Sequence, residues 1–181
     1  MDFLEKDLED IIWENLQTEN GSYNLYCRGF CVDHEKSFYR QVNLGAYGVA
    51  DIIGFKLLPE RGMEGCYIAY IDIYELKKDS ISASTFLQAN RYAKACLKLV
   101  EQYNATLKNK HITAIFDFIL VGSKVELSND FVFLTDTFDN INILTYKINI
   151  DGLKFSTHSG YSQKNCGFIP FPKKLKLRKK W

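Results

Sequence analysis

The sequence predicts an α/β fold in which helices flank a central mixed β-sheet, with a C-terminal β extension. Two observations indicate this fold: a long helical pattern lies in the middle of the chain, and mostly apolar strand patterns lie before and after it. A second helical pattern opens the chain. Because helices and strands do not alternate one by one, the order differs from that of a repeating βαβ wheel. A length of 181 residues favours one domain.

Both helices are predicted from apolar residues that recur at steps of three and four. The first runs over residues 2–16, with Asp2 in position to cap it. The second runs from Ser82 to about Tyr103 and is the longest predicted helix. Its apolar stripe consists of Phe86, Ala89, Ala93, Cys96, Val100 and Tyr103.

Strand patterns account for much of the remaining chain. They occur at about residues 23–32, 38–44, 49–57, 66–77, 112–122, 131–134, 141–148 and 153–156. The run 49–57 is apolar at both alternating positions, which is typical of a strand that is buried on both faces. Residues 59–65 are expected to form a hairpin loop, and the Asp151-Gly152 pair a hairpin turn.

Composition and motifs argue against several classes of protein. The chain has no run of about 18 apolar residues, and its first residues are acidic, so neither a membrane span nor a secretory signal peptide is expected. The five cysteines fit reduced thiols better than a disulfide framework, and Cys27, Cys31 and His34 lack a convincing fourth ligand for zinc. No phosphate loop of the ATP-binding type is present. We therefore expect a cytoplasmic protein that makes no use of a membrane or of ATP.

Residues 173–181 differ in charge from the rest of the chain. They contain six basic residues and no acid, which leaves 17 bases against 22 acids elsewhere. The six are Lys173, Lys174, Lys176, Arg178, Lys179 and Lys180. A basic segment of this kind favours contact with phosphate groups, and Trp181 could stack on a base. A solvated end that binds nothing is the alternative.

Three residues on two predicted strands carry the clearest chemical signal. Asp51 lies inside an apolar run, where a carboxylate is costly to bury unless it is paired or binds a cation. Glu75 and Lys77 are two apart on a later strand and therefore point to the same face. A hairpin between the strands can place Asp51 beside Glu75, and two carboxylates can bind Mg²⁺ through oxygen. A solvent-facing Glu–Lys pair is the alternative for the second strand.

Both predicted helices add candidates. Gln88 and Tyr92 are four apart in the long helix and so share a face, although the rim of a buried helix gives the same pattern. Glu9 lies on the first helix close to Ile12 and Trp13, where a solvated helix face is the alternative.

Taken together, these residues resemble the PD-(D/E)XK nuclease superfamily, and most closely the nuclease domain of NucS/EndoMS-type DNA endonucleases. The Gln-x3-Tyr element is similar to that of RecB-like and lambda-exonuclease-like nucleases. The segments that carry the resemblance are Leu8-Glu9-Asp10-Ile11-Ile12-Trp13-Glu14-Asn15, Tyr39-Arg40-Gln41-Val42, Gly48-Val49-Ala50-Asp51-Ile52-Ile53-Gly54, Tyr74-Glu75-Leu76-Lys77-Lys78 and Gln88-Ala89-Asn90-Arg91-Tyr92. The resemblance covers about residues 3–122, and the order of the segments makes it specific.

The resemblance implies a restriction-endonuclease-like core and a nuclease that hydrolyses phosphodiester bonds in DNA, as an endonuclease, with Mg²⁺ or Mn²⁺ as cofactor. It makes Glu9, Asp51 and Glu75 the metal-binding acids, and it adds Lys77 and Gln88 to them as catalytic residues. It also implies that Arg40 and Tyr92 contact nucleic acid, together with the basic tail. A homodimer is left open.

The sequence departs from the family pattern at two points. Ala50 stands where the motif is named for Pro, and the span from Asp51 to Glu75 holds a longer loop than usual. Mismatch specificity is not carried over, because the separate N-terminal DNA-binding and dimerisation domain of NucS is not recognised in this sequence. Two alternatives stay open: a catalytically silent nucleic-acid-binding module of the same fold, and an RNA-acting or effector-activated defence nuclease.

The predicted domain organisation follows from these patterns. A nuclease-like domain is expected at residues 1–160, with its core at about 3–122 and the β extension to about 160. Residues 161–181 are expected to form a C-terminal segment that ends in the basic tail.

Overall fold

The computed structural model describes residues 3–149 and 152–157 of the chain. The helices are α1 (Glu5–Leu16), α2 (Gly21–Cys27), α3 (Ala83–Asn104) and α4 (Asn129–Thr137), with a 3₁₀ turn, η1, at Gly45–Tyr47. The strands are β1 (Ser37–Asn43), β2 (Val49–Pro59), β3 (Cys66–Leu76), β4 (Ser80–Ile81), β5 (His111–Gly122), β6 (Lys124–Val125), β7 (Ile141–Asn149) and β8 (Gly152–Thr157).

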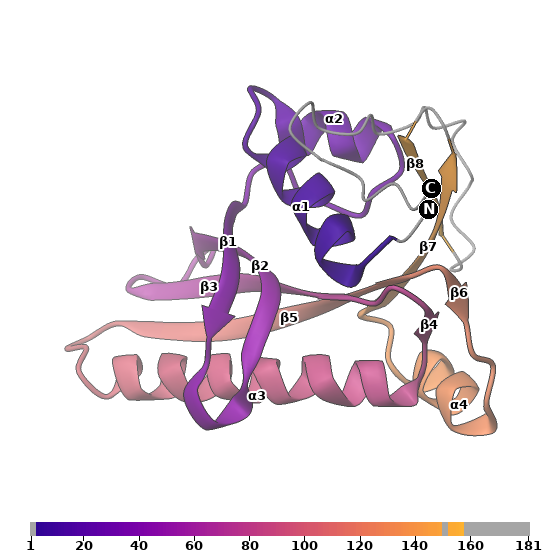
Figure 1. The fold of residues 1–181 in the computed structure, drawn as a ribbon. Helices are drawn as coiled ribbons and strands as arrows, with labels where there is room; N and C mark the ends of the chain where they lie inside the picture. The colour runs from indigo at the N-terminus through magenta and orange to yellow at the C-terminus, as the bar shows by residue number, and fades with distance from the viewer. Residues whose placement is uncertain (1–2, 150–151, 158–181) are drawn as a thin grey trace.

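These elements form an α/β structure around a six-stranded mixed sheet, as the sequence predicts. The long helix α3 lies along one face of the sheet, and α1 and α2 lie on the other (Figure 1). The short strands β4 and β6 pair in parallel and form a separate small sheet. Within the described residues, no helix combines the length and the apolar character that crossing a membrane requires.

The strand order of the main sheet is β1-β2-β3-β5-β7-β8. The first three strands form an antiparallel meander, and α3 then carries the chain across to β5, which pairs with β3 in parallel. Strand β7 pairs in parallel with β5, and β8 returns antiparallel to β7. The predicted C-terminal β extension therefore belongs to the same sheet. Asn149 lies opposite Gly152, and residue 151 of the expected turn is outside the described residues.

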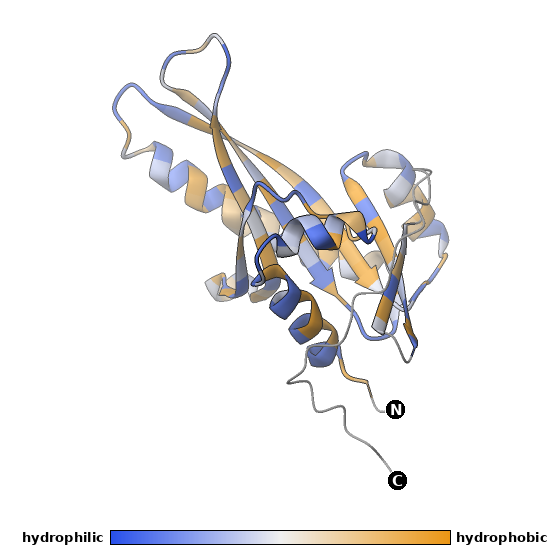
Figure 2. Ribbon diagram, turned by 90° about the horizontal axis from the view of Figure 1, so that it is seen from above, coloured by the Kyte–Doolittle hydropathy of each residue, from blue (hydrophilic) through white to orange (hydrophobic). Residues whose placement is uncertain are grey.

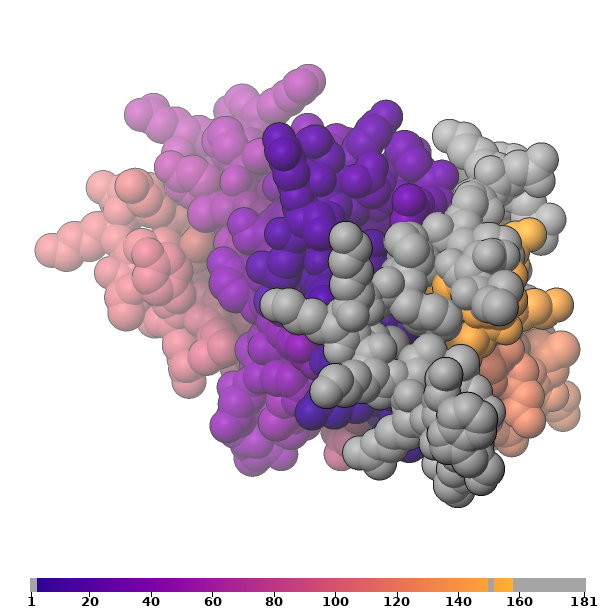
Figure 3. Space-filling model, turned by 45° about the horizontal axis from the view of Figure 1, so that its top comes forward, coloured from indigo at the N-terminus to yellow at the C-terminus, as the bar shows by residue number. Residues whose placement is uncertain are grey.

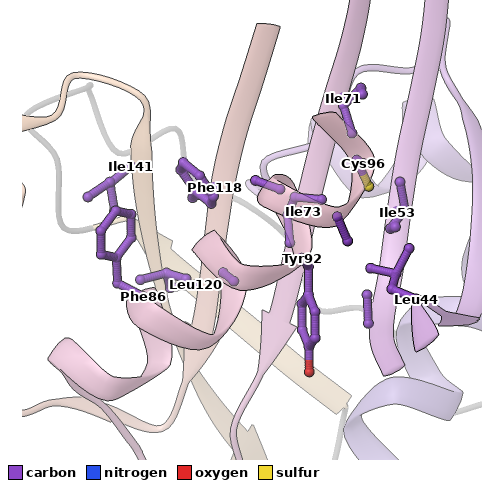
Figure 4. Packing of buried hydrophobic residues seen from close by; sticks show 14 of the residues in the cluster. Leu44, Ile53, Ile71, Ile73, Phe86, Tyr92, Cys96, Phe118, Leu120 and Ile141 are labelled. Carbon is purple, nitrogen blue, oxygen red and sulfur yellow. The ribbon is translucent and has the colours of Figure 1, made fainter. Parts of the chain in front are cut away.

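The face of the sheet toward α3 holds one hydrophobic core (Figure 4). Ile71 and Ile73 of β3 belong to the same buried cluster as Ala89 and Ala93 of α3, whose small side chains allow the helix to lie close to the strands. The opposite face holds a second core under α1 and α2, where the strands show a band of apolar residues (Figure 2). Both faces of the central strands are therefore buried, which explains their nearly continuous apolar sequence.

Two capped helices begin close to their expected positions. Helix α1 begins after Leu4, whose N–H donates to Asp7 Oδ2 at 2.8 Å, so the cap is not the expected Asp2, which lies outside the described residues. Helix α3 begins after Ser82, whose N–H donates to Thr85 Oγ1 at 3.1 Å. In both helices an oxygen at the third position satisfies an amide that the first turn leaves free.

Two predicted strands are wrong. Part of the expected strand 23–32 is the short helix α2, which buries Leu25 against the core. The expected strand 131–134 lies within α4, because Ser128 Oγ accepts a hydrogen bond from the Phe131 N–H at 3.2 Å and caps the helix. Phe131 then packs into the core on the α3 side of the sheet. In both segments, aromatic residues with high strand propensity are held in a helix by tertiary packing.

The long span between the two site carboxylates lies in extended strands, not in a longer loop. Strands β2 and β3 pair from Ile52 opposite Tyr74 to Pro59 opposite Tyr67, and the turn between them occupies residues 60–65. The hairpin projects past α1 and ends near the turn between α3 and β5 (Figure 2). Its tip is tied to that turn, since the His111 N–H donates to the Gly65 carbonyl at 3.0 Å.

A buried ion pair fixes the segment before β1 to the sheet. Lys36 Nζ lies 2.5 Å from Asp72 Oδ1, and the two side chains are only 5% and 6% exposed. Tyr74 also donates its hydroxyl to Asp72 Oδ2 at 3.4 Å. Burial raises the pKa of Asp72, and the Lys36 ammonium acts against that rise.

We expect Lys36→Met to lower the free energy of unfolding by about 3–5 kcal/mol at pH 7, because the change leaves a buried carboxylate without its cation. Urea unfolding measures the effect. Adding Asp72→Asn should recover most of the loss, since both charges are then absent. A loss below about 1 kcal/mol would mean that the pair behaves like a surface salt bridge.

Candidate active site

The β2–β3 hairpin brings Asp51 and Glu75 together. Its last antiparallel pair is Ile52 opposite Tyr74, and Asp51 and Glu75 are the next residues on the two strands. Asp51 Oδ2 accepts a hydrogen bond from the Leu76 N–H at 2.9 Å, which holds its carboxylate at the end of β3. The pairing register therefore places both carboxylates at one end of the hairpin, where β3 leaves the sheet.

Both carboxylates have a raised pKa. Burial raises the pKa of Glu75 to about 7, and the charge of Asp51 adds to the rise while Lys77 opposes it. Burial also raises the pKa of Asp51 to about 6, against the hydrogen bond from Leu76 and the charge of Lys77. The charges of Glu9 and Glu5 raise it further. A nearby cation stabilises the charged form of carboxylates whose pKa is raised by burial and by neighbouring acids.

One oxygen of this pair is fully buried and has no partner. Glu75 is 1% exposed, and its Oε2 is buried without a hydrogen-bond donor. In residues 3–149 and 152–157, Asp51 Oδ1 also has no hydrogen bond. Buried polar atoms are almost always satisfied in folded proteins, so an orphaned carboxylate oxygen indicates a ligand or ion that binds there.

Lys77 extends from the end of β3 into the same site. Its Nζ donates to Glu75 Oε1 at 2.6 Å and lies 3.7 Å from Glu5 Oε1 on α1. Burial acts to lower the pKa of Lys77, but the hydrogen bond to Glu75 and the surrounding carboxylates outweigh it, so the pKa is raised. Lys77 therefore remains a cation at neutral pH and can stabilise negative charge.

Glu9 is held by two neighbouring residues of β1. Arg40 pairs through Nε with Glu9 Oε1 and through its terminal nitrogen with Asp10, and Gln41 Nε2 donates to Glu9 Oε2 at 2.8 Å. The space-filling view shows the indigo surface of α1 directly beside the purple surface of β1 and β2 (Figure 3). Arg40, expected to contact nucleic acid, is thus engaged with the acids of α1, and it fixes that helix to the sheet.

Gln41 is a site residue that sequence reasoning missed. Its φ of 50° lies in the left-handed region, which is uncommon for a residue within a strand. The β1–β2 ladder pairs Arg40 with Ile52 and Val42 with Ala50, but shows no pair at Gln41. This local break turns the Gln41 amide toward Glu9 next to the position of Asp51. A glutamine in a strand pattern carries no signal for such a conformation.

The long helix adds Gln88 and Tyr92. Gln88 Nε2 donates to the Tyr92 hydroxyl at 2.8 Å, so the two do share a face. Tyr92 lies at the edge of the core with its hydroxyl pointing away from the aliphatic cluster (Figure 4). Its ring lies against Gly48, which has a φ of 105° and where an added Cβ would meet Tyr92 Cε1 at 3.3 Å. Burial raises the pKa of Tyr92, against the hydrogen bond from Gln88, and the charges of Glu75 and Asp51 add to the rise.

Among the described residues, the acids do not form a ready-made metal cage. No group of three or more His, Cys, Asp or Glu side chains there is close enough to hold an ion, so Glu9 is not gathered with Asp51 and Glu75 into one cluster. Mg²⁺ needs less: it is commonly bound by one or two carboxylates, with water and substrate phosphate as its other ligands. The chemistry of the Asp51–Glu75 pair and its orphaned oxygen fit such an ion.

Lys173, Lys174, Lys176, Arg178, Lys179 and Lys180 are outside the described residues. The ring of His34 lies 5.8 Å from that of Tyr23 and 6.4 Å from that of Tyr26.

In comparisons with known proteins, no family model, no curated protein and no solved structure matches this chain.

Proposed function

We propose that the chain is a metal-dependent nuclease with a restriction-endonuclease-like core, which hydrolyses phosphodiester bonds in DNA as an endonuclease. The observation that carries the proposal is the Asp51–Glu75 pair: two adjacent carboxylates with raised pKa, one of them with a buried oxygen that has no partner, beside a lysine that stays charged. Carboxylate pairs with a neighbouring cation are suited to phosphoryl-transfer chemistry, in which charge must be neutralised at the reacting centre.

The architecture supports the proposal. The Asp of the motif lies on β2, the Glu-x-Lys element ends β3, and the Gln-x3-Tyr element lies on the crossover helix α3 that follows. Elements from three separate parts of the chain therefore converge on one end of the hairpin, in the order in which the sequence motif names them. The same residues scattered over the surface would not support a nuclease.

In the proposed site, Asp51 and Glu75 hold a divalent cation such as Mg²⁺ or Mn²⁺. Such an ion, when bound, lowers the pKa of a water and neutralises charge on a phosphate. The ammonium of Lys77 stabilises the negative charge that develops on the phosphate or orients the attacking water. Gln88 and Tyr92 position a phosphate at the edge of the site, and Glu9 keeps the region around Asp51 acidic. By the resemblance, the products carry a 5′-phosphate.

The decisive experiment incubates the chain with plasmid DNA, single-stranded DNA and RNA, each with Mg²⁺, Mn²⁺ or EDTA. We expect cleavage of DNA with either metal and none with EDTA. The Asp51→Asn variant, purified in parallel, is the control for contaminating nucleases and should be inactive. Binding without cleavage under every condition would favour the silent binding module, and cleavage of RNA alone would favour the RNA-acting nuclease.

Deleting residues 173–181 is expected to weaken DNA binding and to flatten its dependence on salt, because each phosphate contact contributes about one unit to the slope of log K against log salt concentration. Fluorescence anisotropy with a labelled duplex at several salt concentrations measures the slope. The cleavage rate at saturating DNA should change little, since the Asp51–Glu75 pair is untouched. An unchanged slope would show that the basic tail is only a solvated end.

A further inference from the structure

The proposed site cannot attract a nucleic acid by its own charge. The acids in it and beside it are Glu5, Glu9, Asp10, Asp51 and Glu75, and the cations are Arg40 and Lys77. Their formal sum is −3, which one divalent cation reduces to −1. A phosphate backbone therefore has to gain its affinity from cations outside this group, because like charges repel at short range.

Helix α3 supplies cations next to the site. It carries Arg91, Lys94 and Lys98 but Glu101 as its only acid, and all three basic residues are exposed. Within the described residues, none of the three forms a salt bridge. Arg91, Lys94 and Lys98 follow one another at steps of three and four residues and therefore lie on the same side of α3.

The row formed by Arg91, Lys94 and Lys98 starts at the site and ends at the 3₁₀ turn η1. Gln88, bonded to the site residue Tyr92, precedes Arg91 by three positions and so lies on the same side of the helix. At the other end, Lys98 Nζ lies 5.2 Å from the centroid of the Tyr47 ring of η1. The ten steps along the chain from Gln88 to Lys98 span about 15 Å of helix. That length matches roughly four nucleotides of one strand of a duplex.

We propose that Gln88, Arg91, Lys94 and Lys98 form an edge, here called the α3 basic edge, along which the sugar–phosphate backbone of the substrate lies. This inference rests on the proposed function and adds the surface that holds the substrate on one side of the cleaved bond. The three cations neutralise phosphates that the acidic site itself repels. The Tyr47 ring keeps the Lys98 ammonium at the end of the edge.

The test compares two double variants of the full chain. Arg91→Ala/Lys98→Ala removes two of the three cations of the α3 basic edge, and Lys108→Ala/Lys110→Ala removes two exposed cations from the turn between α3 and β5. Binding of labelled duplex DNA, single-stranded DNA and RNA is measured in EDTA over a range of salt concentrations. Cleavage is measured with Mn²⁺. Circular dichroism confirms that both variants fold.

For the edge variant, the slope of log K against log salt concentration for duplex DNA should fall by about two units, and KM should rise with little change in kcat. The control variant should match the wild type in both. Cleavage by the wild type with an unaltered slope and KM in the edge variant would overturn the α3 basic edge and leave the nuclease standing. Binding that depends on the edge, without cleavage under any condition, would overturn the nuclease alone. A wild type that neither binds nor cleaves would overturn both.

Discussion

Lys77→Met is expected to lower the cleavage rate roughly a hundredfold or more, which is the scale of removing one well-placed electrostatic group, while the chain still folds and binds Mn²⁺. The Lys77 ammonium lies 2.6 Å from Glu75 Oε1 and keeps its charge at neutral pH, so it can act on the charge of a phosphate. Methionine retains most of the apolar stem and removes only the ammonium. Metal affinity, measured by calorimetry alongside the cleavage rate, separates a role of Lys77 in catalysis from a role in metal binding.

The neighbouring lysine offers a matched control. Lys78 follows directly in the chain, and its side chain forms no salt bridge within the described residues, so Lys78→Met should leave cleavage near the wild-type rate. If Lys77 merely balanced Glu75, its loss would affect stability and metal binding more than chemistry. Full cleavage by Lys77→Met would refute the assignment of this lysine as a catalytic residue.

The hairpin and the long helix could be predicted because their signals are local. Strand β3 ends one residue before the expected Lys77, and α3 runs from Ala83 to Asn104, close to the expected bounds. Register then follows from a short turn, which is why the sequence alone leads one to expect Asp51 and Glu75 side by side. The positions of the two site carboxylates could therefore be predicted, because one hairpin determines both.

The partners of Glu9 and the conformation of Gln41 could not be predicted in the same way. Whether Glu9 meets Arg40 depends on how α1 packs across β1, a long-range arrangement that no periodicity encodes. Glutamine has no preference for the positive φ of Gln41, so the sequence carries no local signal for it. Helix α2 was missed for a related reason: seven residues that bury mainly Leu25 are too short for a helical period to outweigh their strand-like composition.

Replacing Glu75 by glutamine is expected to abolish Mn²⁺ binding and cleavage together, which distinguishes it from Lys77→Met. A neutral amide is a poor ligand for a hard cation, and the orphaned Glu75 Oε2 is the atom that most needs one. Mn²⁺ should raise the unfolding temperature of the wild type by mass action and leave that of Glu75→Gln unchanged. Glu64→Gln, an exposed change in the hairpin turn, should respond to Mn²⁺ like the wild type.

Without metal, Glu75→Gln should make the chain more stable than the wild type at high pH. Because the pKa of Glu75 rises from 4.5 to about 7 on folding, the folded state holds its proton longer than the unfolded state does. The stability that this proton contributes is complete below pH 4.5 and is lost as pH rises through 7, where the wild type carries a buried, partly uncompensated charge. Glutamine carries no charge at any pH, so the variant should gain about 2–3 kcal/mol over the wild type between pH 4 and pH 8 in EDTA. Urea unfolding at both pH values measures this gain. If the free energies of unfolding of Glu75→Gln and the wild type differed by the same amount at pH 4 and pH 8, Glu75 would ionise at no cost in the folded chain. The reason to place a cation beside it would then be lost.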